Sequence, residues 1–289
     1  MSYRITTDST SDLPRSFLQE RDIPCVGLAF QLDGQEYRED ENLQLTMTEF
    51  YNALRGGKMS STMQVNTFEF LSFVEPFLAA GEDVLHICFS SGLSGTYASV
   101  VAGAQELKEK YPERKLVVVD SLAASLGEGL LVYYADENRK KGMTLEENAR
   151  WLEENKLHLC HWFTVDDLMF LHRGGRVSKT SAVLGSLLGI KPVLHVDDEG
   201  HLIMMSKARG RQASIQALVK KMKETAIGDV KEQTIFICHG DCMDDAKKLE
   251  EMVRSEMGCH TFLINYTGTV IGSHSGPGTL ALFFLGSHR

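Results

Sequence analysis

The segment SSGLSGT at 90–96 combines four hydroxyl side chains with two glycines, a composition suited to holding an anion. It follows an apolar, strand-like run and leads into an amphipathic helical pattern at 96–110. A turn of this kind presents free backbone N–H groups at a helix start, where the helix dipole also favours negative charge. Ser94 adds a hydroxyl donor, and Gly95 lets a ligand approach the backbone closely. The pattern predicts an anion site, and an ordinary helix cap is the alternative.

Two further turns after strand-like runs are rich in polar side chains, TDSTSDLP at 7–14 and DSLAASLGEG at 120–129. Ligands of open α/β sheets lie beyond the carboxyl ends of the strands, so these turns and the one at 90–96 indicate a shared polar site. For Asp8 and Asp120 taken individually, capping and turn formation are the stronger interpretation.

Basic side chains gather in two glycine-containing loops of an otherwise acidic chain. The first, LHRGGRVSKT, holds Arg173, Arg176 and Lys179, and the second, SKARGRQ, holds Lys207, Arg209 and Arg211. Guanidinium groups match the geometry of phosphate and carboxylate groups, so both loops are candidate contacts for a phosphate or a partner. A solvated surface, or pairing with the chain's own acids, is the alternative.

Thr62 and His274 are further candidates, each in a short polar segment. Thr62 lies in SSTMQ between two helical patterns, and His274 lies in GSHSGPG, which we expect to be a loop because of its glycines and proline. A loop histidine can donate a hydrogen bond to an anion. Ser94 and His274 could also belong to a Ser–His–Asp triad, but Ser94 is not in a G-x-S-x-G elbow. A Ser-dependent esterase or acyl-transfer hydrolase therefore stays the alternative function.

The sequence provides little for a metal or a cofactor. Cys238 and Cys242, with His239 and Asp241 between them, form the closest set of potential ligands, but no second cluster completes the four that zinc prefers. The chain also has neither a P-loop nor a Rossmann fingerprint, which disfavours a nucleotide-binding regulator. We expect no metal and no cofactor. The six cysteines include no C-x-x-C pair, which fits a reducing, cytoplasmic setting.

Composition excludes several classes of protein. With 43% hydrophobic and 24% charged residues, the chain is typical of a globular protein and not of a disordered one. Thirty bases against 39 acids give a net charge of −9, which argues against nucleic acid as a partner. The first residues contain no apolar signal core, and no apolar run approaches the roughly 18 residues that span a membrane.

Strand-like and helical patterns alternate along the chain, which predicts the α/β class. The strand-like runs lie at 3–7, 24–31, 84–90, 115–120, 157–165, 190–196, 201–208, 234–240, 260–265 and 280–285, and helical patterns include 96–110, 211–226 and 243–257. Continuous apolar runs predict a mostly parallel first sheet with helices on both faces. A polar turn between the runs at 190–196 and 201–208 predicts a hairpin, hence a mixed second sheet with helices. We place a boundary near residue 155, which gives domains 1–155 and 156–289.

Six motifs occur in a specific order and spacing. They are TDSTSDLP (7–14), SSGLSGTY (90–97), VVDSLAASLGEG (118–129), TVDDLMFLHRGGRVS (164–178), GIKPVLHVDDEGHL (189–202) and GSHSGPGTLALFF (272–284). Together they resemble the DegV family, the fatty-acid-binding proteins of bacterial fatty acid kinase systems. The resemblance extends from about residue 3 to residue 286, and its specificity lies in the ordered set.

The resemblance implies two α/β domains with one long-chain fatty acid between them, of the palmitate, stearate or oleate type, its tail in an apolar tunnel. It also implies that the chain is not an enzyme. Instead, the chain would present the acyl carboxylate to a separate ATP-dependent fatty acid kinase. A transient encounter with a membrane surface is compatible with that role.

The resemblance also implies residue roles. Matched by motif, the residues around the carboxylate are Thr62, Ser94, Gly95 and His274. Arg173 and Arg176 would lie near the ligand mouth, associated with the kinase or the phosphoryl group. We place Lys207 and Arg209 at the same edge. Met63 stands where many family members have a serine after the ligand threonine.

Overall fold

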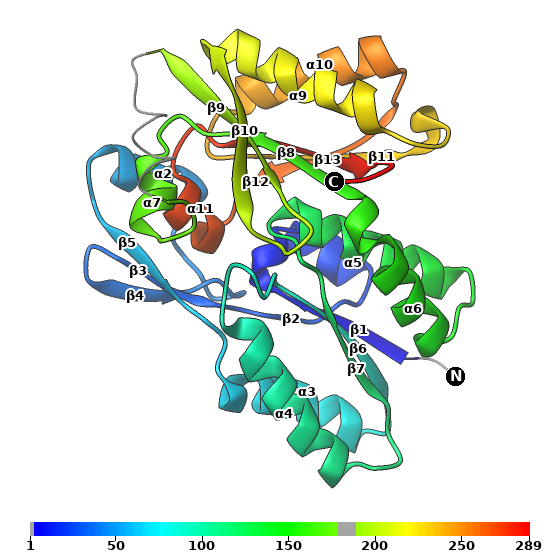
Figure 1. The fold of residues 1–289 in the computed structure, drawn as a ribbon. Coiled ribbons are helices and arrows are strands. Elements are labelled where there is room, and N and C mark those ends of the chain that lie inside the picture. The colour runs from blue at the N-terminus through cyan, green and yellow to red at the C-terminus, as the bar shows by residue number, and fades with distance from the viewer. Residues whose placement is uncertain (1–2, 179–188) are drawn as a thin grey trace.

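Four strands among the first 120 residues form a fully parallel sheet. The computed structural model describes residues 3–178 and 189–289, and in it this sheet has the order β2–β1–β6–β7. The strands are β1 (Tyr3–Asp8), β2 (Cys25–Val26), β6 (Asp83–Cys88) and β7 (Leu116–Asp120). Helices α3 (Thr67–Ala79) and α4 (Thr96–Lys110) cover one face, and α5 (Leu126–Lys140) and α6 (Leu145–Asn155) cover the other (Figure 1). Burial on both faces explains the apolar runs without alternation.

The second sheet is mixed and has six described strands in the order β10–β9–β8–β13–β11–β12. They are β8 (Leu159–Thr164), β9 (Ile190–Val196), β10 (Leu202–Arg209), β11 (Thr234–His239), β12 (Thr261–Tyr266) and β13 (Leu280–Leu285). Only β11 and β12 pair in parallel, and β9 and β10 form the predicted hairpin. Helices α9 (Arg211–Thr225) and α10 (Met243–Met257) cover its outer face (Figure 1). The α/β class, with one parallel and one mixed sheet, is confirmed.

Helix α5 lies between the two sheets and packs on both (Figure 1). Its side chains Leu126 and Leu130 share one hydrophobic core with Ile5 of β1 and with Phe163 and Phe236 of the mixed sheet. The layers therefore follow one another as α3 with α4, the parallel sheet, α5 with α6, the mixed sheet, and α9 with α10 (Figure 1).

The chain passes from one large sheet to the other through a short 3-10 turn. Helix α6 ends at Asn155, and η2 (Lys156–His158) leads directly into β8. All strands of the parallel sheet precede this point and all described strands of the mixed sheet follow it. The division into domains 1–155 and 156–289 stays a prediction.

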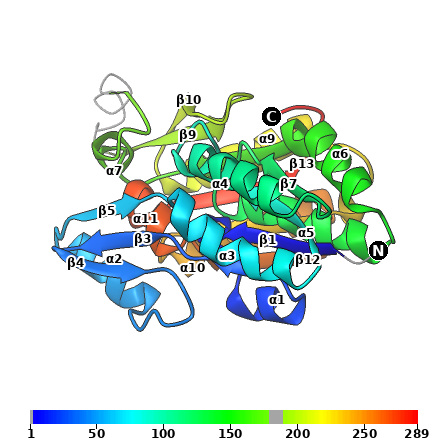
Figure 2. The ribbon, with the colours of Figure 1, turned by 90° about the horizontal axis from the view of Figure 1, so that it is seen from below.

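The structure contains a third sheet, which is antiparallel and was not predicted from the sequence. Its strands are β3 (Ala29–Leu32), β4 (Gln35–Arg38) and β5 (Ser60–Met63), with α2 (Met47–Arg55) between β4 and β5 in the chain. Figure 2 shows this sheet beside α2 and α11 (Thr269–Ser275). The expected single strand at 24–31 divides between β2 and β3, and the polar segment at 60–64 contains the edge strand β5. A short polar edge strand lacks the apolar alternation that would reveal it.

His274 lies in helix α11, so the expectation that GSHSGPG is entirely a loop is wrong. The helix ends at Ser275 and is capped by Gly276, whose φ of 77° an L side chain rarely adopts. Small residues such as Gly272 and Ser273 are buried, because α11 packs closely against the three-stranded sheet, α2 and α7 (Met169–Arg173). Tyr51 also fixes the chain before α11, since its hydroxyl donates to the carbonyl oxygen of Thr267 at 2.7 Å. Glycine content here reflects close packing instead of a loop.

The remaining described elements are short. They are η1 (Ser9–Ser11), α1 (Arg15–Glu20) and η3 (Val230–Glu232). Of the described helices, none combines the length and apolar character needed to cross a bilayer.

Arg289 connects three separate segments through their backbone carbonyl groups. Its side chain is buried, and Nη1 donates to the carbonyl oxygens of Leu122 and Asp197 at 2.7 and 2.9 Å. Nη2 donates to those of Lys156 and Ser121 at 2.9 and 3.3 Å. The acceptors lie after β7, in the link between the two large sheets, and in the β9–β10 turn. One guanidinium group thus joins the two halves of the chain.

We expect Arg289→Ala to lower the free energy of unfolding by about 2 kcal/mol or more, because buried carbonyl groups lose their donor. Urea denaturation followed by circular dichroism measures this change. Arg150→Ala is the control, since Arg150 is exposed on α6, and it should change the value by less than about 0.5 kcal/mol. Equal effects of the two substitutions would contradict a structural role for Arg289.

Candidate ligand-binding site

A cavity of about 180 Å³ lies where the carboxyl ends of the parallel strands face the mixed sheet. Leu28, Phe89 and Ala124 line it from the turns after β2, β6 and β7. Phe163 and Phe283 line it from the inner face of the mixed sheet. The cavity therefore occupies the position in which open α/β sheets bind ligands.

Four lining residues are those predicted to surround a carboxylate: Thr62, Ser94, Gly95 and His274. Oγ1 of Thr62 lies 2.7 Å from Nε2 of His274, a hydrogen bond between β5 and α11. Oγ of Ser94 accepts from the N–H of Thr96 at 3.1 Å, and Gly95 is the capping residue of α4. The structure thus brings two hydroxyl groups, an imidazole and a helix N-terminus to one cavity.

Gly174 sets the position of the His274 ring. A Cβ atom added at Gly174 would overlap Nδ1 of His274, so only glycine lets the end of α7 approach the imidazole this closely. In the RGGR motif, the sequence pattern indicated a role for the two arginines only, and it did not predict this contact of Gly174. Gln64, which also lines the cavity and donates to Ser99 Oγ at 3.1 Å, was missed as well, because nothing in its local pattern distinguishes it.

Arg176 is the one member of the predicted basic set that lines the cavity within the described residues. Its Nε and Nη2 donate to the carbonyl oxygen of Leu93 at 3.2 and 3.0 Å, and its Nη1 donates to that of Gly174. Burial, with a smaller effect of the Arg176 charge, lowers the pKa of His274 to about 4. At neutral pH the imidazole is therefore uncharged, and Arg176 is the one cationic side chain among the described residues that line the cavity.

The other predicted basic residues lie outside this cavity. Arg173 is exposed at the end of α7, where its guanidinium carbon lies 4.5 Å from the centre of the Phe170 ring. Lys207 and Arg209 are exposed on β10, and neither forms an ion pair with a described residue. Lys179 falls outside the residues that the structure describes.

Asp120 connects two of the three polar turns that were predicted to share a site. Its Oδ1 accepts from the N–H groups of Ser91 and Leu122, both at 3.1 Å. Asp8 accepts from the N–H of Thr10 at 3.0 Å and caps η1. Both aspartates therefore act as caps or turn formers, which was the stronger interpretation of their sequence context.

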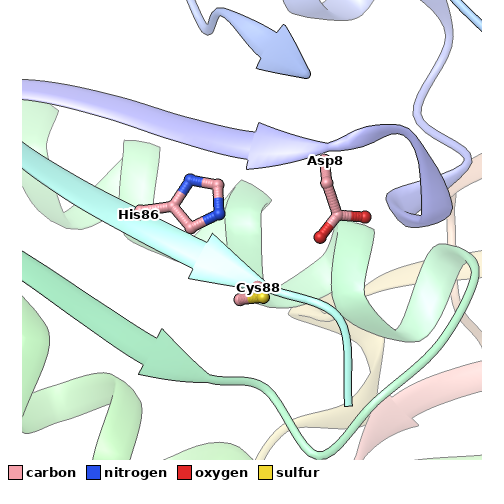
Figure 3. A group of neighbouring side chains, drawn as sticks. All are labelled: Asp8, His86 and Cys88. Atoms are coloured by element: carbon pink, nitrogen blue, oxygen red, sulfur yellow. The ribbon is translucent and has the colours of Figure 1, made fainter. Parts of the chain in front are cut away.

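Asp8, His86 and Cys88 form a buried group of potential metal ligands, with their ligand atoms within 4.8 Å of one another. Figure 3 shows His86 and Cys88 on one strand and Asp8 at the end of its neighbour. The Asp8 carboxylate already accepts from both polar groups of Thr10 and from the N–H of Phe89 at 2.9 Å. Burial raises the pKa of Cys88 well above its usual value, so the thiol is protonated. A metal would have to displace these donors, and we interpret the group as a hydrogen-bond network.

The side chains of the CHGDC segment also form internal hydrogen bonds. His239 Nδ1 accepts from the N–H of Cys242 at 3.2 Å, and the Cys242 thiol donates to the carbonyl oxygen of Thr279 at 3.3 Å. The Cys238 sulfur lies 3.2 Å from the hydroxyl oxygens of both Ser125 and Thr267. Within the described part of the chain, these residues do not form a group with metal-ligand geometry.

Comparison with known proteins gives one family over nearly the whole chain. The model of the family described as "Uncharacterised protein, DegV family" matches residues 2–287. A DegV domain-containing protein of Clostridium perfringens is 49% identical over 285 residues, which cover 99% of this chain and 98% of that one.

Solved structures agree with this assignment. A DegV family protein from Thermus thermophilus, described as binding fatty acid, has a TM-score of 0.89 at 34% identity. The match covers 99% of this chain and 100% of the Thermus chain. A Thermotoga maritima protein, also described as having a fatty acid binding function, has a TM-score of 0.85 at 31% identity, with 99% of each chain covered. The protein therefore belongs to the DegV family.

Proposed function

We propose that this protein binds a long-chain fatty acid, with the carboxylate at Thr62, Ser94, Gly95 and His274 and the tail along the apolar walls of the same cavity. The hydrogen bond between Thr62 and His274 carries the proposal, because it joins two residues 212 positions apart at the cavity that also holds Ser94. The fatty-acid-binding relatives from Thermus and Thermotoga support the ligand class.

The tail and the head group contribute differently to binding. Burial of about 14 methylenes at about 0.8 kcal/mol each would give roughly 11 kcal/mol before the costs of association and ordering. A carboxylate buried without partners would lose several kcal/mol. Hydroxyl groups, backbone N–H groups and an imidazole can satisfy it without a full counter-charge. The head group is thereby held weakly enough to stay available for chemistry by another protein.

We further propose that the protein is a non-catalytic carrier, which presents the carboxylate to a separate ATP-dependent fatty acid kinase in the cytoplasm. The support is a set of four basic side chains. Arg176 lines the cavity, while Arg173, Lys207 and Arg209 are exposed and can meet a partner or a phosphoryl group. A transient encounter with a membrane surface, where a carrier could collect or release its lipid, fits this role.

The alternative, a Ser-dependent esterase or acyl-transfer hydrolase, has less support from the geometry. The hydrogen-bond partner of His274 is Thr62, whereas the Ser94 hydroxyl lies 3.0 Å from that of Thr96. Among the described residues, no carboxylate hydrogen bonds to His274, so nothing fixes the ring as a general base for Ser94. Labelling of Ser94 by a fluorophosphonate, together with turnover of p-nitrophenyl esters, would instead favour the hydrolase.

We expect Ser94→Ala and His274→Ala to weaken binding of palmitate or oleate by about tenfold to a hundredfold, because each removes a hydrogen bond to a charged group. Ser99→Ala is the control, since Ser99 lies one turn along α4 and does not line the cavity. Titration calorimetry measures the affinities, and mass spectrometry of lipid extracted from purified protein tests for a bound fatty acid. Protein that is always lipid-free and binds neither acid would refute the proposed function.

The pKa of His274 should rise when a fatty acid binds, because the adjacent carboxylate favours the imidazolium form. In ligand-free protein this pKa of about 4 lies below the ordinary value of 6.5, so the unfolded chain binds the proton more tightly. His274 therefore lowers the stability of the empty protein as pH falls from 6.5 towards 4. NMR titration of labelled histidine, with and without oleate, measures the pKa. No ligand-induced shift would remove His274 from the carboxylate site.

Arg173→Ala should leave fatty acid affinity within about twofold of the native value, since Arg173 does not line the cavity. We expect it to slow acyl phosphate formation by a cognate kinase by about tenfold or more, as loss of a charged contact does. A coupled ATPase assay with Arg150→Ala as the surface control gives the rates. Unchanged turnover would exclude Arg173 from the encounter with the kinase.

A further inference from the structure

His161 is a buried, polar side chain in the wall of the cavity. It lies on β8, has 1% of its surface exposed, and lines the cavity from the mixed sheet. Neither Nδ1 nor Nε2 makes a well-formed hydrogen bond to a described residue. A buried polar group without a partner is unfavourable, so its presence here points to a ligand group that pairs with it.

The neighbours of His161 in the sheet are apolar. Strand register places it opposite Phe283, and the two rings meet edge to face with centroids 5.6 Å apart. Phe163 and Ala281 follow on the same face of the same strand pair. On the helix side, Gly127 in the first turn of α5 faces His161. A Cβ atom at this position would overlap the imidazole, so the glycine leaves room for the ring.

Three other polar side chains of the lining, Ser125, Cys238 and Thr267, already have partners. Ser125 donates to the carboxylate of Asp12, and the Cys238 sulfur lies 3.2 Å from the hydroxyl oxygens of Ser125 and Thr267. All of them except Asp12 line the cavity. Among the described lining residues, His161 and Ser275 have unused side-chain hydrogen-bonding capacity, and His161 is the one that lies on the mixed sheet.

The chemistry of the ring defines the group that it can bind. Burial lowers the pKa of His161 well below its usual value, so the imidazole is neutral and offers one N–H donor and one acceptor nitrogen. A hydroxyl group can both accept and donate, so it can use either nitrogen. A second carboxylate is disfavoured, because a neutral ring among phenylalanines provides no compensating charge.

We propose that the preferred ligand of this cavity is a fatty acid whose chain carries a hydroxyl group, and that His161 hydrogen bonds to that hydroxyl group. The inference rests on the proposed fatty acid binding and adds to it the class of acyl chain. Thr62, Ser94 and His274 hold the carboxylate, and His161, on a different element, selects the chain.

The test compares stearate with 9-, 10- and 12-hydroxystearate, because the chain position that faces His161 follows from the binding pose. We expect the native protein to bind at least one hydroxystearate about tenfold more tightly than stearate, the effect of one added hydrogen bond in a buried site. His161→Phe should abolish that preference and keep or improve stearate binding. His161→Gln, which retains a donor and an acceptor, should preserve part of the preference.

His195→Phe is the matched control, because His195 is buried on the same sheet but stacks on Trp162 and does not line the cavity. It should leave the preference unchanged. If native protein binds stearate as well as or better than every hydroxystearate, and His161→Phe changes none of the ratios, a water molecule satisfies the ring and the inference is overturned. Failure to bind stearate and all hydroxystearates would instead count against fatty acid binding itself.

Discussion

The position of helix α5 between the two large sheets is the constraint on which the cavity depends. A helix about 10 Å across keeps the sheets apart along its length. Where α5 begins, at Leu126, the same layer continues as the cavity, which Ala124 and Ser125 line just before the helix starts. Glu128 anchors this end, since its buried carboxyl group forms hydrogen bonds with the hydroxyls of Thr7 and Thr10 at 3.0 and 2.9 Å. The cavity thus occupies the space, within the layer between the two sheets, into which α5 would extend if it began earlier.

The polar groups at this site are arranged so that little charge is buried. His274 is neutral because of its burial, and the cation at the edge, Arg176, is held by carbonyl groups and not by an acid. Among the described residues, no carboxylate forms a hydrogen bond or ion pair with Arg176, so none competes with a ligand for its guanidinium group. An arriving anion meets donors that are already oriented, which lowers the cost of ordering them on binding.

The sequence predicted those parts of the fold that depend on local pattern. Apolar runs without alternation predicted the parallel strands, and the polar turn at 197–200 predicted the β9–β10 hairpin. Patterns that tertiary packing overrides were misjudged. The run at 24–31 joins two sheets, and α11 is a helix despite its glycines, because small side chains suit its crowded surroundings. The hydroxyl-rich turn at Ser94 was a candidate because of its chemistry. Thr62 and His274 were candidates because of their short polar segments, but only the resemblance grouped them with Ser94, since no spacing rule relates residues so far apart. Gly174 and His161 could not be recognised at all without the three-dimensional contacts.

The hydrogen bond between Thr62 and His274 crosses between early and late parts of the chain, as does the clamp of Arg289. Neither half of the molecule contains the complete set of proposed carboxylate donors, so the proposed function links occupancy to the integrity of the whole fold. A ligand that binds only the folded protein stabilises it in proportion to the logarithm of its concentration. Cellular proteases remove unfolded chains, so under the proposed function a well-supplied lipid pool would lengthen the lifetime of this protein and scarcity would shorten it. The abundance of this protein would then follow the supply of its cargo without any dedicated regulator.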